Sequence, residues 1–246
     1  MILRRVIDHF RKQEWTAIVI DFVIVVLGVF VGLQVNNWNE ARREQLSEAQ
    51  YLERFAEEIA LTLQHIQNER AFGESSIDSI ELFADRLYRS GVSDEDLMSS
   101  AADYFSEGAF FAKFNPNRTT FDDLITTGNF DIIREEGIRT SLIKLHALYT
   151  DAKDTLEGNI DWAQQGEAHV YYTFDAFRFD RRTQKLFGGG SADNFADEIR
   201  QNRDLLRRHA GFHYWIKVRS IELYDQVEPQ ARAALELINA ELEARS

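Results

Sequence analysis

The sequence contains no cysteine, two prolines and 13 glycines in 246 residues. The absence of cysteine excludes disulfides, thiol nucleophiles and cysteine-bound metals, although it suits both oxidising and reducing compartments. The scarcity of proline and glycine argues against a disordered chain or an all-β fold. Positive charge is also scarce, and the formal net charge is -13. A surface that acidic repels DNA and RNA, so we expect no nucleic-acid partner.

One long apolar run stands out in this acidic chain, DFVIVVLGVFVGLQV at residues 21–35. As a helix that rises about 1.5 Å per residue, Trp15–Asn36 would measure about 33 Å, close to the roughly 30 Å hydrocarbon core of a bilayer. Trp15 and Trp38 flank the run, as expected for side chains that prefer the membrane interface. The run therefore predicts a transmembrane helix at residues 15–37.

The alternatives to a membrane span are a buried core helix and a cleaved signal peptide. A core helix of a soluble protein would carry more polar positions than Thr16, Asp21 and Gln34. Cleavage of a signal peptide requires small residues just after the apolar core, and none follows Leu33. An uncleaved signal anchor is the favoured interpretation.

The distribution of basic residues predicts the orientation of this span. Four basic residues precede the span and two follow it closely: Arg4, Arg5, Arg11 and Lys12, then Arg42 and Arg43. By the positive-inside rule, the N-terminus is expected in the cytoplasm. Residues 1–14 are expected to form a basic amphipathic segment on the cytoplasmic leaflet, with a disordered tail as the alternative. Residues 38–246 would then be an extracytoplasmic domain, periplasmic in a bacterium whose inner membrane holds the span.

One face of the predicted span combines its acidic group with two small residues. At helical spacing this face contains Asp21, Val25, Gly28, Gly32 and Val35. The Gly-x-x-x-Gly pair allows two helix backbones to approach closely, which favours a homo-oligomer or a membrane protein partner over a lone span. Asp21 either pairs with basic groups near the cytoplasmic surface or has a functional role, since an ionisable group in a span is costly.

A polar signature follows this face where the chain would leave the bilayer, and it consists of Gln34, Asn36, Asn37, Trp38, Asn39 and Glu40. Together with Asp21, Gly28, Gly32, Leu33 and Arg42, it resembles the start of a bacterial family of single-span proteins, domain of unknown function 6090. The segment 119–133, TTFDDLITTGNFDII, is similar to a Thr-rich segment of that family. The resemblance implies a membrane-anchored, mostly helical protein and no particular activity. On its own chemistry, the signature is typical of a membrane interface.

The remaining sequence predicts helices throughout. Apolar residues recur at helical spacing over 52–66, 77–87, 138–160 and 195–206, and no chain breaker lies between Asn39 and Arg70. Ser93 with Asp96, and Thr120 with Asp123, resemble helix caps, and Gly91 and Gly128 are expected helix ends. We expect an irregular stretch at 107–118 and a loop at 178–192. A last helix is marked by Trp215, Val218, Leu235, Ile238 and Leu242, and Pro229 is expected to kink or split it. The predicted fold is therefore all-α, an N-terminal transmembrane helix that continues into a stalk and an antiparallel helical bundle.

No motif in the sequence identifies a catalytic residue, cofactor or metal site. His209 and His213 have the spacing of one helix face, but no HExxH pattern supplies a third metal ligand and Gly211 lies between them. The run Gly188–Ser191 lacks the Lys that a phosphate-binding loop requires. We therefore expect a non-enzymatic interaction or scaffold protein of the cell envelope. The alternatives are an ion-coupled accessory subunit that uses Asp21 and an extracytoplasmic hydrolase without a recognisable motif.

Overall fold

The computed structural model describes residues 2–111, 113–174, 179–180, 185–186 and 192–245, with side chains for 19–111, 113–170 and 195–245. The chain divides into two compact units, residues 1–51 and 52–246, which are described separately. The prediction of an all-α fold is confirmed. The elements are α1 (Ile2–Tyr88), α2 (Asp94–Asp103), the π-helix η1 (Tyr104–Gly108), α3 (Thr119–Thr127), the 3₁₀-helix η2 (Phe130–Ile132), α4 (Glu136–Phe174), β1 (Phe179–Asp180), β2 (Lys185–Leu186), α5 (Ala192–Gln201) and α6 (Arg203–Arg245).

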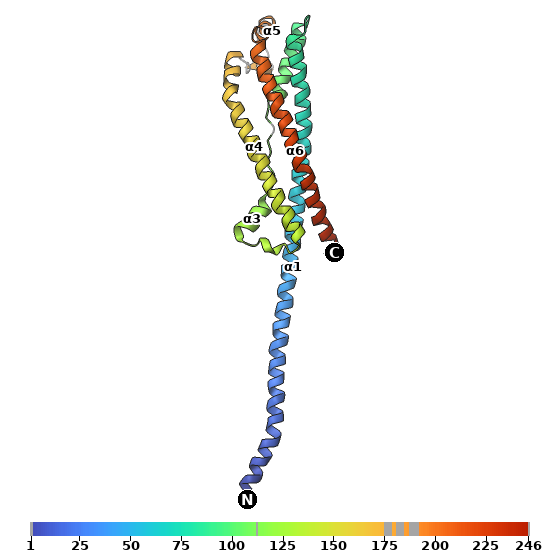
Figure 1. Ribbon diagram of the computed structural model, residues 1–246, viewed down its shortest axis with the longest axis vertical. Helices are drawn as coiled ribbons and strands as arrows, with labels where there is room; N and C mark the ends of the chain where they lie inside the picture. Colours follow the sequence, from blue (N-terminus) through green and yellow to red (C-terminus); the bar gives the residue numbers. More distant parts are fainter. Residues whose placement is uncertain (1, 112, 175–178, 181–184, 187–191, 246) are drawn as a thin grey trace. The chain divides into compact units, whose positions relative to one another are not determined.

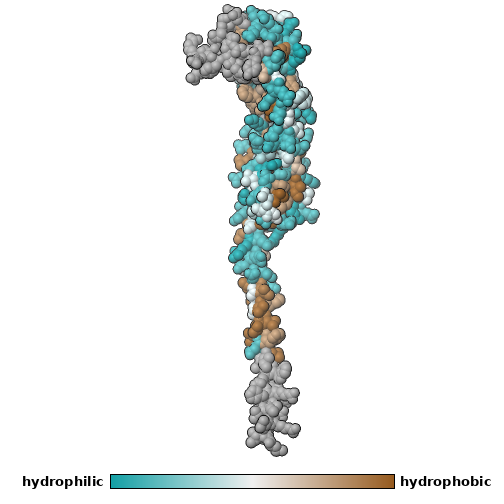
Figure 2. All heavy atoms as spheres, turned by 90° about the vertical axis from the view of Figure 1, so that its left-hand side faces the viewer, coloured by the Kyte–Doolittle hydropathy of each residue, from teal (hydrophilic) through white to brown (hydrophobic). Residues whose placement is uncertain are grey.

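The first unit consists of the N-terminal part of α1. It contains a helical stretch long and apolar enough to cross a membrane, none of which is buried against the described chain. All thirteen of its large apolar side chains between Val19 and Val35 are exposed, and Figure 2 shows this stretch as a brown band. The helix has no proline and begins at Ile2, inside the segment 1–14 that was predicted to be basic and amphipathic. The side chains of that segment lie outside the described residues, so its amphipathic character stays a prediction.

The second unit is a bundle of three long helices, residues 52–88 of α1, α4 and α6 (Figure 1). Helices α1 and α6 are antiparallel, because Arg70 pairs with Glu228 at 2.8 Å whereas Tyr88, later in α1, donates a hydrogen bond to Asp204, earlier in α6, at 2.9 Å. The predicted apolar stripes of α1 and α4 face the core, including Leu52, Ile66, Ile80, Ile138, Leu142 and Leu156. The antiparallel bundle follows from the burial of these stripes.

The irregular stretch predicted at 107–118 begins in the π-helix η1, and its described residues after Gly108, 109–111 and 113–118, form no helix or strand. Phe114 in this stretch is 3% exposed and contacts His65 of α1, Tyr149 of α4 and Tyr224 of α6 with its ring. One aromatic side chain therefore joins all three helices.

At the other end of the bundle, α2, η1 and α5 close the core around a cluster of buried apolar residues. The cluster includes Phe83, Leu97, Tyr104, Ile199 and Leu206. The predicted cap of α2 is confirmed, because Ser93 accepts a hydrogen bond from the Asp96 backbone N–H at 3.1 Å. Gly91 follows α1 at a φ of 78°, a left-handed conformation that glycine adopts without strain.

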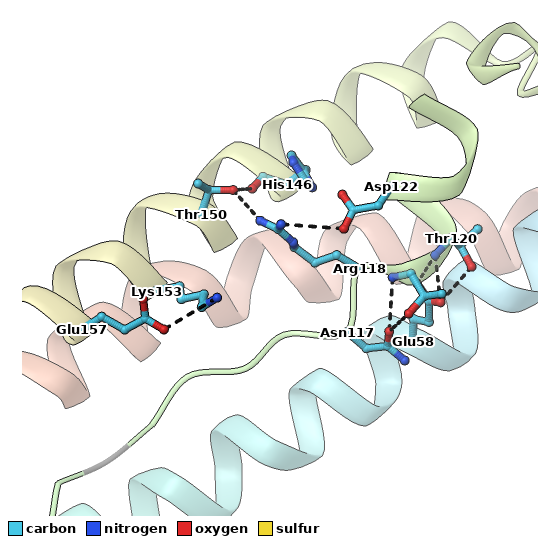
Figure 3. A network of polar contacts seen from close by, with 10 residues as sticks. Glu58, Asn117, Arg118, Thr120, Asp122, His146, Thr150, Lys153 and Glu157 are labelled. Atoms are coloured by element: carbon cyan, nitrogen blue, oxygen red, sulfur yellow. Dashed lines mark hydrogen bonds and ion pairs between the residues drawn. The ribbon is translucent and has the colours of Figure 1, made fainter. Parts of the chain in front are cut away.

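The cap predicted for α3 is wrong. Thr120 does not cap the helix through its own side chain; instead its backbone N–H and its hydroxyl both donate to the carboxylate of Glu58 on α1, at 3.0 and 2.8 Å (Figure 3). Beside them Arg118 donates to Thr150 of α4 at 2.8 Å. A side chain 62 residues upstream thus supplies the negative charge that the first turn of α3 favours. Gly128 ends α3 at a φ of 69°, as predicted.

Three further expectations concern the C-terminal part of the chain. Pro229 does not split the last helix, since α6 extends over Arg203–Arg245 with the proline inside it. Within the predicted loop 178–192, β1 and β2 form a two-residue antiparallel pair, while Gly188–Ser191 lies outside the described residues. The buried face of α6 agrees with the predicted stripe at Ile238, which is fully buried, but differs at Trp215, which is 42% exposed, and it includes Ala231 and Ala234.

Candidate functional site

The predicted helix–helix face is part of α1 in the first unit. Asp21, Val25, Gly28, Gly32 and Val35 are all exposed, and they have the spacing of one face of this helix. A Cβ built on Gly28 or Gly32 would have no described atom within 4 Å. The face is therefore open along the part of the chain that the structure describes, and its use as an interface stays a prediction.

The polar signature lies on the same helix and begins at Gln34, where the helix–helix face ends. Gln34, Asn36, Asn37, Trp38, Asn39 and Glu40 are all helical and exposed. The Arg42 guanidinium lies 5.9 Å from the centre of the Trp38 ring, a cation–π arrangement between residues four apart. An indole and a cation held side by side suit the head-group region of a membrane.

The structure also reveals a cluster of polar side chains inside the bundle. Glu167 of α4 and His209 and His213 of α6 are 9%, 7% and 0% exposed. The histidines share a face of α6 because they lie four residues apart and Gly211 does not interrupt the helix. Antiparallel packing of α4 on α6 brings Glu167 to the same level. The cluster therefore depends on two helices whose contributing residues lie 42 positions apart or more.

The three side chains meet at a single oxygen. Nε2 of His209 lies 3.0 Å and Nε2 of His213 lies 2.6 Å from Oε1 of Glu167. The imidazole rings are 4.6 Å apart at their centres, so both nitrogens approach the carboxylate from neighbouring directions. One ligand atom from each of the three residues lies within 4.8 Å of the other two.

The electrostatics of the cluster favour an ionised Glu167 and a neutral His213. Burial disfavours the carboxylate, but hydrogen bonds from the two histidines outweigh it and lower the pKa of Glu167 to about 2. Burial also lowers the pKa of His213, and although Glu167 opposes this shift, His209 and Lys217 add to it. The lowered pKa of Glu167 and the lowered pKa of His213 are compatible, because a neutral imidazole still donates its Nε2–H to a carboxylate.

Tyr104 orients His209 from the other side of the ring. Its hydroxyl lies 2.6 Å from Nδ1 of His209, and its ring stacks on Phe83 at 4.8 Å between centres. Tyr104 starts the π-helix η1, whose i to i+5 bond runs from the Ala109 N–H to the Tyr104 carbonyl at 2.8 Å. A Cβ on Gly108 would come within 2.8 Å of the Tyr104 ring, so glycine permits this close packing.

A buried lysine continues the polar face of α6 beyond the histidines. Lys217 is 0% exposed, and its Nζ has no hydrogen-bond partner among the described residues. The ammonium instead lies 4.4 Å from the centre of the Phe72 ring of α1. Burial lowers the pKa of Lys217 to about 8, while Glu69 acts in the opposite direction.

A cleft of about 600 Å³ between α4 and α6 reaches two members of the cluster. Glu167 and His209 line it, together with Trp162, Arg208 and Phe212. His213 lies behind them, with its ring stacked on Phe111 at 5.0 Å between centres. The cleft gives small solutes a route to the Glu167 carboxylate and to His209.

Sequence reasoning identified the His209/His213 pair but not Glu167, because no local pattern connects a glutamate on α4 to histidines on α6. One signal was present. Glu167 falls on the buried side of α4 between Ala163 and Val170, which are 2% and 4% exposed. A glutamate on an apolar face is rarely fully buried without a partner, so its position predicts a buried counterpart.

No protein-family model matches this chain, and neither does any curated protein or solved structure. The resemblance to domain of unknown function 6090 therefore stays a prediction.

Proposed function

We propose that this protein is a single-pass protein of the bacterial inner membrane, with a cytoplasmic N-terminus and a periplasmic helical domain. The exposed apolar residues of α1 carry this proposal. Thirteen large apolar side chains from Val19 to Val35 lie uncovered. Fully burying such a side chain is worth about 1.5–3 kcal/mol, and these are 46–67% exposed, so removing the band from water amounts to roughly 10–20 kcal/mol. That is as large as the 5–15 kcal/mol by which domains are usually stable, and a bilayer is the environment that supplies it.

Within the membrane, we propose that the protein is a non-enzymatic interaction protein that pairs with a second copy through the face defined by Asp21, Gly28 and Gly32. Both glycines are exposed and open in the described chain, so a second backbone can approach them closely. The polar signature from Gln34 to Glu40 would then lie at the membrane surface, where amide side chains can bond across the helix pair. The resemblance to single-span bacterial proteins supports the membrane anchor alone.

The orientation can be tested directly because the chain has no cysteine of its own. A single cysteine at Ala147, an exposed position on α4, should react with a membrane-impermeant maleimide in intact spheroplasts. A cysteine added before Met1 should react only after the membrane is permeabilised. The reverse labelling pattern would place the helical domain in the cytoplasm and refute the proposed topology.

The association can be tested by purifying the full-length protein in mild detergent and measuring its mass and co-purifying proteins. We expect a dimer that becomes monomeric in the variant Gly28→Ile/Gly32→Ile. The matched control is Val23→Ile/Val26→Ile, which adds bulk on the opposite face and should remain dimeric. A monomer in all forms contradicts the proposal, and a different membrane protein lost only from the glycine variant would replace the second copy as partner.

A further inference from the structure

The polar cluster of the bundle has the composition of a metal site. We propose that Glu167, His209 and His213 bind one divalent transition-metal ion, with zinc as the expected metal. This inference is independent of the membrane proposal, because all three residues lie in the second unit. It rests on three buried side chains, each of which offers one donor atom within 4.8 Å of the other two.

The donor geometry is close to that of a tetrahedral metal centre. Zinc lies about 2.0–2.2 Å from nitrogen and oxygen ligands, which places tetrahedral ligands roughly 3.3–3.5 Å apart. The two nitrogens lie 2.6 and 3.0 Å from the Glu167 oxygen. Each nitrogen–oxygen distance therefore has to increase by less than about 1 Å for the hydrogen-bonded cluster to become a coordination shell, and small side-chain rotations can supply that increase.

The donor types select the class of ion. Two imidazole nitrogens and one carboxylate oxygen suit zinc and other first-row divalent transition metals, whereas calcium and magnesium prefer oxygen ligands throughout. Two histidines and one glutamate also leave one tetrahedral position for water or a ligand. The cleft is lined by Glu167 and His209, which gives the ion a path of entry to two of its three ligands.

Tyr104 provides the outer support that metal-binding histidines generally have. A histidine that binds metal through Nε2 carries its proton on Nδ1, and this N–H is usually held by a neighbouring acceptor. The Tyr104 oxygen lies 2.6 Å from Nδ1 of His209 and can accept that hydrogen bond. The stacking of Tyr104 on Phe83 fixes the direction of the hydroxyl. The tyrosine is thus a positioning residue for the metal ligand.

The alternative to a metal site is a purely structural hydrogen-bond cluster. Both arrangements hold α4 against α6, so a loss of stability in Glu167 or histidine variants does not separate them. The ligand identity does separate them, because a cysteine can replace a metal-binding histidine but cannot reproduce its hydrogen bond to a carboxylate at the same strength. The cysteine-free chain makes any thiolate signal specific to the introduced residue.

The test uses the full-length protein in detergent, reconstituted with Zn²⁺ or Co²⁺ as probes. We expect one tightly bound zinc per chain by elemental analysis, no zinc in Glu167→Gln, and a 10–100-fold weaker affinity in Tyr104→Phe. The control His169→Asn changes an exposed histidine that lines the same cleft and should still bind one zinc. Circular dichroism of each variant verifies that the bundle remains helical.

A ligand exchange provides the decisive readout even where a removal variant fails to fold. His213→Cys loaded with Co²⁺ should show a thiolate-to-cobalt charge-transfer band, and the control His169→Cys should show none. A wild-type protein that binds no stoichiometric metal, a Glu167→Gln variant that retains it, or a His213→Cys variant without the band would each overturn the proposal.

Discussion

Two stretches of helix in this protein reverse the usual relation between polarity and burial, and they do so in opposite ways. Residues 19–35 of α1 expose apolar side chains, whereas residues 209–224 of α6 bury polar ones. The buried polar residues of α6 are His209, His213, Lys217, Ser220 and Tyr224. In a soluble protein the first pattern would be unstable and the second costly.

The difference shows that each reversal has its own physical origin. The apolar band of α1 has no covering residues in the described chain, so the compensation must come from outside it. The polar face of α6 has its partners inside the bundle, Glu167 for the histidines and the Phe72 ring for Lys217, although the ring offsets only part of the cost of burying the lysine charge. Exposure of apolar surface therefore indicates an environment, while burial of polar groups indicates specific partners.

Charges introduced into the apolar band should have the largest effect. Val25→Arg/Val29→Arg places two charges near the centre of the predicted span, each costing about 2.5–3.5 kcal/mol on insertion scales. We expect the double variant to leave the membrane fraction on alkaline extraction. The control Ile143→Arg changes an exposed apolar residue of the bundle and should leave membrane retention unchanged. Equal extraction of the two variants would contradict the proposal that the apolar band of α1, and not the bundle, holds the protein in the membrane.

Removal of one phenylalanine ring should distinguish the regions next. Phe83 is 0% exposed in the bundle core, so Phe83→Ala should lower the free energy of unfolding by about 3–5 kcal/mol. Phe30 is 59% exposed in the apolar band, and Phe30→Ala should leave bundle stability unchanged. Chemical denaturation in detergent, followed by circular dichroism, measures both. A similar loss from the two variants would show that the band packs on the bundle.

Replacement of the buried lysine should stabilise the protein. The pKa of Lys217 is lowered to about 8 by burial, with Glu69 acting the other way, so its charge is a penalty in the folded state at pH 7. Lys217→Met should raise the free energy of unfolding by about 1–3 kcal/mol, partly offset by the lost contact with Phe72.

The pH dependence checks the origin of this gain. Between about pH 8 and the ordinary lysine pKa of about 10.4, the unfolded chain binds one more proton at this site than the folded chain. The free-energy cost of the buried lysine charge is fully present below about pH 8. Wild-type stability should therefore rise with pH between about pH 8 and 10.4, as this cost disappears. In Lys217→Met the rise should be smaller, because the contribution from the titration of Lys217 is absent. An identical pH profile in both proteins would contradict the assignment.

The smallest effect is expected on the outer face of α6. Arg219 forms an ion pair with Glu222, and both side chains are roughly half exposed. Exposed pairs usually contribute less than about 1 kcal/mol, so Arg219→Ala should change the unfolding free energy by no more than about 0.5 kcal/mol. A loss as large as that of Phe83→Ala would show that polarity, and not burial, sets the importance of residues on this helix.

The sequence predicted those parts of the fold whose burial follows hydropathy. The stripe from Leu52 to Ile66 is buried as expected, since apolar side chains at helical spacing leave one way to pack. The same reasoning misplaced the N-terminal half of the buried face of α6, because its polar residues made the inward side look like the outer one, whereas Ile238 further along is buried as predicted. Trp215, chosen for its hydropathy, is half exposed, while Lys217 beside it is fully buried.

The candidate site was only half predictable for a related reason. His209 and His213 are connected by local helix geometry, which spacing reveals. Their connection to Glu167 depends on how α4 and α6 align, and hydropathy alone does not determine the axial position of one helix against another. The orientation of Tyr104 depends in addition on the π-helix, which has no local signal in the sequence.

The dependence of α3 on Glu58 has a consequence for the order in which the protein folds. A nine-residue helix is too short to persist alone in water, and although Asn117 accepts the Thr119 N–H locally, the Thr120 N–H is bonded to a residue 62 positions away. The first turn of α3 can be completed only after α1 has formed and the intervening chain has returned to it, an ordering that carries the entropy of closing a long loop. A peptide of residues 115–130 should therefore be unstructured, and in the intact protein the amides of α3 should exchange with solvent earlier than those of the helix that caps it.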